Sequence, residues 1–287
     1  MQSSNPVFRR AEGFNGRSQV YPASGVSYPA YGSAPAGGQT GYAGGYGDPS
    51  TPQTMAPSTQ PMTIDSVVQK TGLTVGLTIL TAAATWVLTP QIDPATGAAG
   101  PLYALAMLGA FGGLALSFVN SFKRVVSPPL VLAYAVLEGI FVGAFSKAIE
   151  AQFGNGLVIG AVVGTFAAVG GTLAAYKFFN IRVSDRFRKW VVAAMFGFVA
   201  LALLDLVLSL FGASFGFNGF GPMGLISSVV GLGLGVLLLI LDFDFVERGI
   251  AAGLPERESW RAAFGLTVTI IWIYIELLRI LAILRGN

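Results

Sequence analysis

The sequence predicts an all-α integral membrane protein, a bundle of seven transmembrane helices that follows a disordered N-terminal tail. Hydrophobic residues make up 53% of the 287 residues and charged residues only 11%, whereas soluble domains carry about 25% charged residues. Each apolar span reaches the ~20 residues that a helix needs to cross a bilayer. The stretch before the spans is rich in Gly, Pro, Ser and Tyr. These observations divide the chain into a tail, residues 1–62, and a transmembrane domain, residues 63–287.

The tail carries too few large aliphatic side chains to offset the entropy that ordering would cost, as in YPASGVSYPAYGSAPAGGQTGYAGGYGDP. It also lacks the charged and then apolar start of a signal peptide. We expect it to be a solubilising tail. The alternative is a segment whose spaced tyrosines bind a partner or associate with one another.

The apolar spans are separated by connectors that contain Pro and Gly, which interrupt helices. We expect the sixth helix to continue toward residue 252, because Gly253 and Pro255 form the first stop signal after it. The spans lie at about residues 67–88, 102–122, 130–149, 157–179, 190–211, 223–242 and 262–284.

Lys and Arg are unevenly distributed between the two sides of such a bundle. If the N-terminus is cytoplasmic, 14 of the 17 positive residues lie on the cytoplasmic side, as expected for cytoplasmic loops. We therefore expect a multi-pass protein of the cell membrane with its tail in the cytoplasm. The 14 residues are Arg9, Arg10, Arg17, Lys70, Lys123, Arg124, Lys177, Arg182, Arg186, Arg188, Lys189, Arg248, Arg257 and Arg261.

Glycines recur at four-residue spacing on three of the predicted helices. In a membrane, small residues let helix backbones approach closely and so hold helices together. We expect these glycines to pack the helices of one bundle. The alternative is a homodimer contact along the fourth helix. The glycines are Gly139 and Gly143, then Gly156, Gly160 and Gly164, then Gly231 and Gly235.

Four acids lie within or at the ends of the apolar spans: Glu138, Asp205, Asp242 and Glu276. An acid at the centre of a transmembrane helix costs roughly 2.5–3.5 kcal/mol on insertion scales, so each should face the bundle interior or a water-filled crevice. Glu138 and Asp205 either line an ion path or are satisfied by interhelical hydrogen bonds. A further acid, Asp244, is expected to pair with Arg248 at the cytoplasmic rim, because the two are four residues apart.

Asp242 has no basic residue three or four positions away and needs a partner from another helix. Counted from the intervening turn, Asp242 lies ~15 Å and Glu276 ~24 Å along their helices, a difference that helix tilt can absorb. We expect these two acids to meet and share one proton. Lys123 or Arg124 would hold the ionised Asp242 as a latch. The alternative for Glu276 is an ion pair with Arg279.

The sixth span ends in LDFD at 241–244, and the seventh contains YIELLRIL at 274–281. This pattern resembles the Bax inhibitor-1 family, also called YccA-like, over roughly residues 66–284. The resemblance implies a calcium-leak protein with a central C-terminal helix and a pair of pH-sensing acids. It also implies control of a membrane protease and a role in stress responses. Asp242 takes the first acid position and Glu276 the second, where the family usually has Asp.

The function that we expect is a pH-sensitive leak of cations, calcium above all, rather than an enzyme activity. The chain has no His and no Cys, which removes the usual zinc and haem ligands and leaves carboxylates as the pH-responsive groups. We expect no cofactor and no nucleic-acid partner. Calcium prefers several oxygen ligands, and scattered acids suit a site that an ion can leave. The alternative is a non-conducting regulator that binds a membrane protease or another membrane complex.

Overall fold

The computed structural model describes residues 60–90 and 100–286, so the predicted disorder of residues 1–59 lies outside the described residues. The described part contains seven α-helices, and each is long and apolar enough to cross a membrane. The predicted fold class is confirmed, and the chain is a multi-pass membrane protein. The helices are α1 (Ile64–Leu88), α2 (Gly100–Phe122), α3 (Pro128–Phe153), α4 (Leu157–Phe178), α5 (Asp185–Leu210), α6 (Pro222–Ala251) and α7 (Ser259–Gly286), with the 3-10 helix η3 (Glu256–Glu258) before α7.

Apart from α4, the helices extend beyond the apolar spans, because hydropathy marks the hydrocarbon region and not the helix ends. α5 begins at Asp185, where the Ser184 hydroxyl accepts a hydrogen bond from the Phe187 N–H and caps the helix. α6 continues to Ala251, as predicted, and the chain turns at Gly253, whose φ of +64° favours glycine. The α6–α7 hairpin therefore has a short, tightly folded turn.

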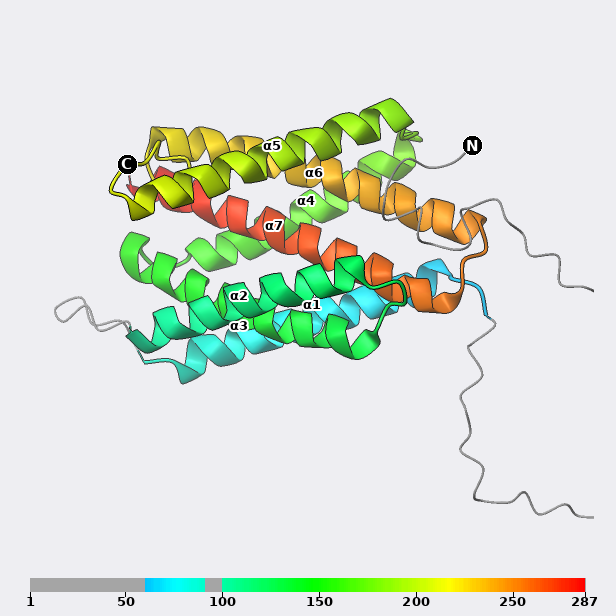
Figure 1. The fold of residues 1–287 in the computed structure, drawn as a ribbon, viewed down its shortest axis with the longest axis horizontal. Coiled ribbons are helices and arrows are strands. Elements are labelled where there is room, and N and C mark those ends of the chain that lie inside the picture. Colours follow the sequence, from blue (N-terminus) through cyan, green and yellow to red (C-terminus); the bar gives the residue numbers. More distant parts are fainter. Residues whose placement is uncertain (1–59, 91–99, 287) are drawn as a thin grey trace, which may run out of the picture. The chain divides into compact units, whose positions relative to one another are not determined.

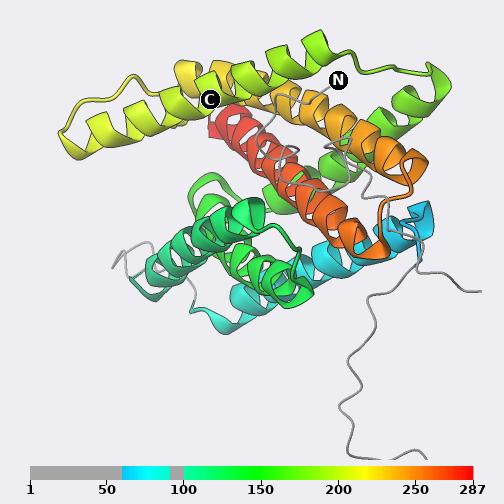
Figure 2. The same ribbon diagram turned by 45° about the vertical axis from the view of Figure 1, so that its right-hand side comes forward.

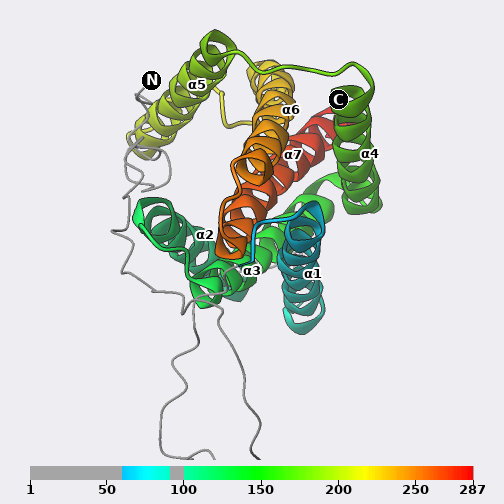
Figure 3. The same cartoon turned by 90° about the vertical axis from the view of Figure 1, so that its right-hand side faces the viewer.

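α7 is the central helix, as the family resemblance implied. It packs against α1, α3, α4 and α6, whereas α2 packs mainly on α3 and α5 mainly on α6. Figures 1 and 2 show α7 between α5 on one side and α1 on the other. Figure 3, which looks along the bundle, shows the other helices arranged around it. We call the end where α1 begins the near end, and the end where α7 finishes the far end.

Residues 60–62, which the sequence assigned to the tail, belong to the helical unit. The Met62 N–H donates to the Leu254 carbonyl at 2.7 Å, and the Glu256 N–H donates to the Gln60 carbonyl at 2.9 Å. The Met62 side chain is 1% exposed and packs with Leu239 and Leu266. The boundary at residue 62 was therefore wrong by three residues, because the extended segment before α1 pairs with the α6–α7 turn.

The glycines pack helices within the bundle, as predicted. A Cβ added at Gly143 of α3 would collide with the Ala82 carbonyl of α1. Gly160 and Gly164 of α4 face leucines of α7, and a Cβ at Gly164 would lie 3.3 Å from Leu277. These two positions of the α4 ridge are therefore occupied by α7 and do not form a homodimer contact.

Candidate functional site

Asp242 lies on the near half of α6 and faces α7. The Thr269 hydroxyl of α7 donates a hydrogen bond to its carboxylate at 2.6 Å. Gly265, one turn away on α7, leaves room for the same carboxylate, because a Cβ there would lie 3.6 Å from Asp242 Oδ1. Asp242 is half-buried and Thr269 is buried. Asp242 is therefore an acid on α6 that is hydrogen-bonded to α7 through the neutral Thr269 hydroxyl.

The expected pairing of Asp242 with Glu276 is wrong. Glu276 lies opposite Gly231 of α6, where an added Cβ would be 2.7 Å from its carboxylate. Gly231 and Asp242 are eleven residues apart on one helix, which separates them by ~16 Å at 1.5 Å per residue. The sequence-based estimate allowed helix tilt to absorb the offset between the two acids. The short turn before α7 instead fixes the register of the hairpin with Thr269 opposite Asp242.

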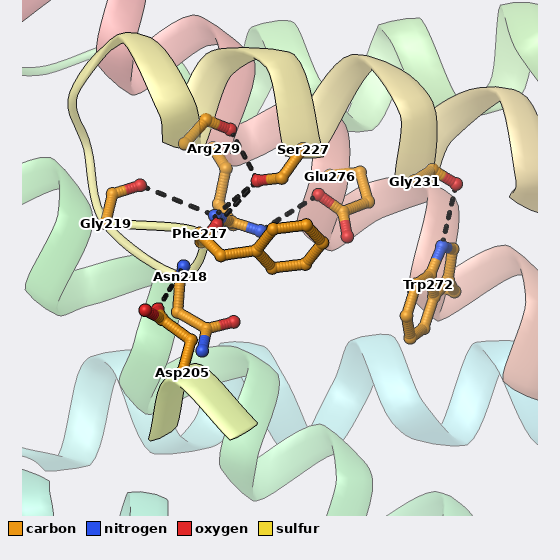
Figure 4. Close-up of polar contacts among 10 residues, drawn as sticks. Asp205, Phe217, Asn218, Gly219, Ser227, Gly231, Trp272, Glu276 and Arg279 are labelled. Carbon is orange, nitrogen blue, oxygen red and sulfur yellow. Dashed lines mark hydrogen bonds and ion pairs between the residues drawn. The ribbon is translucent and has the colours of Figure 1, made fainter. Parts of the chain in front are cut away.

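Glu276 is paired with Arg279, the alternative that the sequence left open. Arg279 Nη1 donates to Glu276 at 3.2 Å, and both side chains are buried. Arg279 Nη2 donates to the Phe217 carbonyl at 2.9 Å and also reaches the Gly219 carbonyl and the Ser227 hydroxyl. Figure 4 shows the guanidinium between the Glu276 carboxylate and these oxygens. These hydrogen bonds connect the loop between α5 and α6 to α7.

Asp205 anchors the same loop to α5. Its carboxylate accepts hydrogen bonds from the Phe215 N–H at 2.6 Å and the Asn218 N–H at 2.9 Å. The Asn218 side-chain amide donates a hydrogen bond to the Ala202 carbonyl of α5 at 2.7 Å. Figure 4 shows the contact between Asp205 and Asn218. Two roles were considered for Asp205, lining an ion path or forming interhelical hydrogen bonds. The contacts match a carboxylate whose hydrogen bonds are satisfied, although the donors are amides of the α5–α6 loop and not of another helix.

Asp244 forms the rim ion pair that was predicted, and a second one. Arg248 Nε donates to its carboxylate at 3.0 Å, and Arg188 Nη2 of α5 donates at 2.7 Å. The Asp244 side chain is only 8% exposed, so the two guanidinium groups neutralise a nearly buried acid. This cluster ties the near end of α5 to α6.

Glu138 is half-buried on α3 and faces α2. A Cβ added at Gly113 of α2 would lie 2.6 Å from its carboxylate. Within residues 60–90 and 100–286, Glu138 forms no ion pair. It is therefore an acid in the α2–α3 contact without a cation beside it.

The latch predicted for Asp242 is not formed. Lys123 and Arg124 are exposed just beyond the end of α2. The segment after α2 contacts α7 through its backbone: the Arg124 carbonyl accepts a hydrogen bond from the Arg261 side chain at 2.9 Å. Asp242 is held by Thr269 instead. The sequence placed the basic pair and Asp242 on the same membrane face but could not give the distance between them.

Lys147 is a buried basic residue on α3 for which the sequence predicted no role. It is 4% exposed, and its Nζ donates to the Trp86 carbonyl at 2.8 Å and the Thr89 carbonyl at 2.6 Å. These carbonyls lie at the end of α1, where helix carbonyls have no partner within the helix. Lys147 thus caps α1 from α3. A single Lys inside an apolar span was the signal that could have identified it.

Comparison with known proteins adds two matches. A family model described as Bax inhibitor 1 like matches residues 5–286. An uncharacterized protein of Chlamydia muridarum (strain MoPn / Nigg) is 31% identical over 198 residues, which cover 66% of this chain and 80% of the relative. No solved structure matches the chain.

Proposed function

We propose a function for this chain, which belongs to the Bax inhibitor 1 like family: a pH-sensitive leak of cations, calcium above all, with Asp242 as the group that takes up the proton. The observation that carries the proposal is the environment of Asp242. It is an acid on a transmembrane helix whose hydrogen-bond partner is the Thr269 hydroxyl of the next helix. An acid in this setting is expensive to insert into a membrane and has a functional role by default.

Asp242 can affect a passing cation in two ways. Its ionised carboxylate attracts the ion, and its hydrogen bond with Thr269 joins α6 to the central helix α7. Protonation removes the negative charge of Asp242. The Thr269 hydroxyl then donates its hydrogen bond to a neutral carboxyl group instead of a carboxylate, and such a bond is weaker. The loss of the carboxylate charge weakens cation binding, so we propose that the leak falls as the pH falls.

A weak site fits this role better than a tight one. In the described part of the chain, no three acidic side chains gather into a group that could hold a metal ion. A tight calcium site uses six to eight oxygen ligands, whereas conduction requires a site that the ion can leave. The Asp242 carboxylate and the Thr269 hydroxyl suit brief contact with a partly hydrated cation.

The test is cation flux into liposomes that contain the purified full chain, measured over a range of pH. We expect Asp242→Asn to lower the flux at high pH and to make the remaining flux independent of pH. An ion–carboxylate attraction of ~1.4 kcal/mol lies within the range for charges near a protein surface and corresponds to about tenfold in flux. Asp185→Asn is the matched control, because the Asp185 side chain is 84% exposed at the start of α5. A wild-type pH profile in Asp242→Asn would reject the proposal.

A second candidate is a non-conducting regulator that binds a membrane protease or another membrane complex. It is favoured by the number of acids with structural partners. Asp205 holds a loop, Asp244 pairs with two arginines and Glu276 pairs with Arg279. Fewer acids are then left to line an ion path. The same liposome experiment separates the candidates, because the regulator would give no flux at any pH without its partner.

A further inference from the structure

A cavity of about 340 Å³ lies between α1, α3, α4 and α7, away from the buried acids. Its volume falls at the lower end of the range for ligand pockets, ~300–1,000 Å³. Figure 3 shows α1 and α4 on the same side of α7, with α3 behind them. Its walls include Ala83, Trp86, Val142, Val162, Phe166 and Ile271.

The hydroxyl groups in the walls are already hydrogen-bonded. Thr165 donates to the Ala161 carbonyl within its own helix at 2.7 Å. The Ser146 and Tyr274 hydroxyls bond to each other at 2.7 Å across the α3–α7 contact. A buried water needs two to four polar partners, and apolar cavities stay dry or take up apolar molecules. The walls therefore favour a hydrocarbon occupant over water.

The cavity continues into the lipid-facing surface of the bundle. Side chains of its walls are also exposed on the outside of α1 and α4, as for Ile79 (50%), Val87 (77%) and Phe166 (58%). α1 and α4 both pack on α7 and do not pack closely on each other, which leaves a lateral opening between them. Hydrocarbon chains of the bilayer surround this surface at the depth of a transmembrane helix.

The cavity lies in the far half of the bundle. It follows α1 from Val75 to Val87, near the end of that helix, and α4 from Val158 to Phe166, near its start. Along α1 this length corresponds to ~18 Å at 1.5 Å per residue, which is slightly more than the ~15 Å of one leaflet, half of a core ~30 Å thick. An occupant that enters from one leaflet and lies along the helices is therefore favoured.

We propose that this cavity is a binding site for one acyl chain of a bilayer phospholipid. The chain would enter between α1 and α4 and lie against α7 at Ile270, Ile271 and Tyr274. These residues are on the stretch of α7 between Thr269, which bonds Asp242, and Glu276, which pairs with Arg279. The acyl chain would thus support the central helix from the side opposite α6.

The test uses the full chain in liposomes of phosphatidylcholine that include a phosphatidylcholine with a diazirine on one acyl chain. After illumination, mass spectrometry of peptides locates the labelled residues. We expect labelling of the cavity walls on α1, α4 and α7 to exceed, several-fold, labelling of an ordinary lipid-exposed surface such as Leu201 and Leu204 of α5. Equal labelling of the cavity and of α5 would overturn the proposal.

Two cavity-filling variants sharpen the test. Ala83→Phe fills the cavity from α1, and its matched control is Ala84→Phe, since Ala84 is also exposed but is not part of the walls. Val162→Trp fills the cavity from α4 and is used if Ala83→Phe fails to fold. We expect the filling variants to lose the labelling of Ile271 and the control to keep it. Equal labelling in Ala83→Phe and Ala84→Phe would reject the site.

Two further outcomes identify other occupants and also reject the proposal. Labelling by a diazirine fatty acid but not by the phospholipid would assign the cavity to free fatty acids. Labelling only in detergent micelles would assign it to detergent. The readout needs no ion flux, so a chain that fails to leak cations can still bind the lipid, and a failure of lipid labelling leaves the proposed leak in place.

Discussion

Arg279 connects the far end of α7 to the α5–α6 loop through several contacts of one side chain. Its guanidinium neutralises Glu276 and donates to the Phe217 and Gly219 carbonyls of a loop 60 residues earlier in the chain. Arginine suits this position because its planar group offers five donors in a fixed geometry, which lysine does not. A buried ion pair is tolerated when such additional hydrogen bonds satisfy both partners.

We expect Arg279→Gln to destabilise the protein. Removing one partner of a buried ion pair typically costs about 3–5 kcal/mol, because the other charge stays buried and unpaired. The double variant Glu276→Gln/Arg279→Gln should recover part of this loss, since it leaves no unpaired charge. The measurement is the free energy of unfolding in detergent micelles by urea titration.

Arg285→Gln is the control for this substitution, because Arg285 is exposed at the end of the same helix. If Arg279→Gln and Arg285→Gln unfold at the same urea concentration, the buried pair contributes nothing to stability. A double variant that is less stable than Arg279→Gln would also contradict the assigned pairing.

The sequence predicted that the acids of the apolar spans face other parts of the bundle more reliably than it predicted their partners. The pair Asp244–Arg248 was predicted, and the pair Glu276–Arg279 was the alternative to the expected Asp242–Glu276 contact, because the members of each pair lie about one helical turn apart. Thr269 was not foreseen as the partner of Asp242, because that contact depends on the register of two helices and hence on the exact length of their turn. Nonlocal partners of this kind leave no pattern in the sequence.

Small residues determine how closely the helices approach one another. Gly143 of α3 crosses α1 at Ala82, and Gly235 of α6 crosses α7, where an added Cβ would lie 2.9 Å from Ile273. Helix association in membranes relies on such close packing, because lipid tails provide no hydrophobic force between helices. The four-residue spacing of the glycines made this packing predictable, but not which helix each ridge would face.

We expect Gly143→Val to weaken the α1–α3 contact strongly. The new side chain would overlap the backbone of Ala82, which cannot move aside as a flexible side chain could, and overpacking typically costs about 1–3 kcal/mol or more. Gly170→Val is the matched control, because a Cβ at Gly170 of α4 meets no atom within 4 Å. Thermal melting in detergent compares the two variants, and equal melting temperatures would contradict the tight crossing.

Within residues 60–90 and 100–286, most of the Lys and Arg side chains lie at one end of the helical unit. α1, α3, α5 and α7 begin at the near end and α2, α4 and α6 finish there, so the basic residues that flank them share one side. Examples are Lys70, Arg188 and Arg261, each in an ion pair at that end. The distribution supports a cytoplasmic near end. Labelling of a single cysteine at Arg186 from outside intact cells would reject that orientation.

The fold as a whole was predictable because its dominant signals are local. The length of the apolar spans predicted the seven helices, and Gly253 with Pro255 predicted where α6 ends. The start of the folded unit was missed, since Met62 follows Pro61 in a stretch whose composition resembles the tail. Its burial depends on a contact with Leu254, almost two hundred residues later in the chain.

Met62 should therefore mark where shortening the tail begins to destabilise the protein. A chain that starts at Gln60 after an initiator methionine keeps the Gln60 and Met62 contacts with residues 254–256. We expect it to unfold like the full chain, since the compact helical unit begins at Gln60. A chain that starts at Thr63 should be less stable.

In the full chain, Met62→Ala should lower the free energy of unfolding by about 2–5 kcal/mol, as for other buried methionines. Ile64→Ala, at a residue 64% exposed, is the control. If the chains that start at Gln60 and Thr63 unfold at the same urea concentration, residues 60–62 are dispensable for folding and the burial of Met62 contributes no stability.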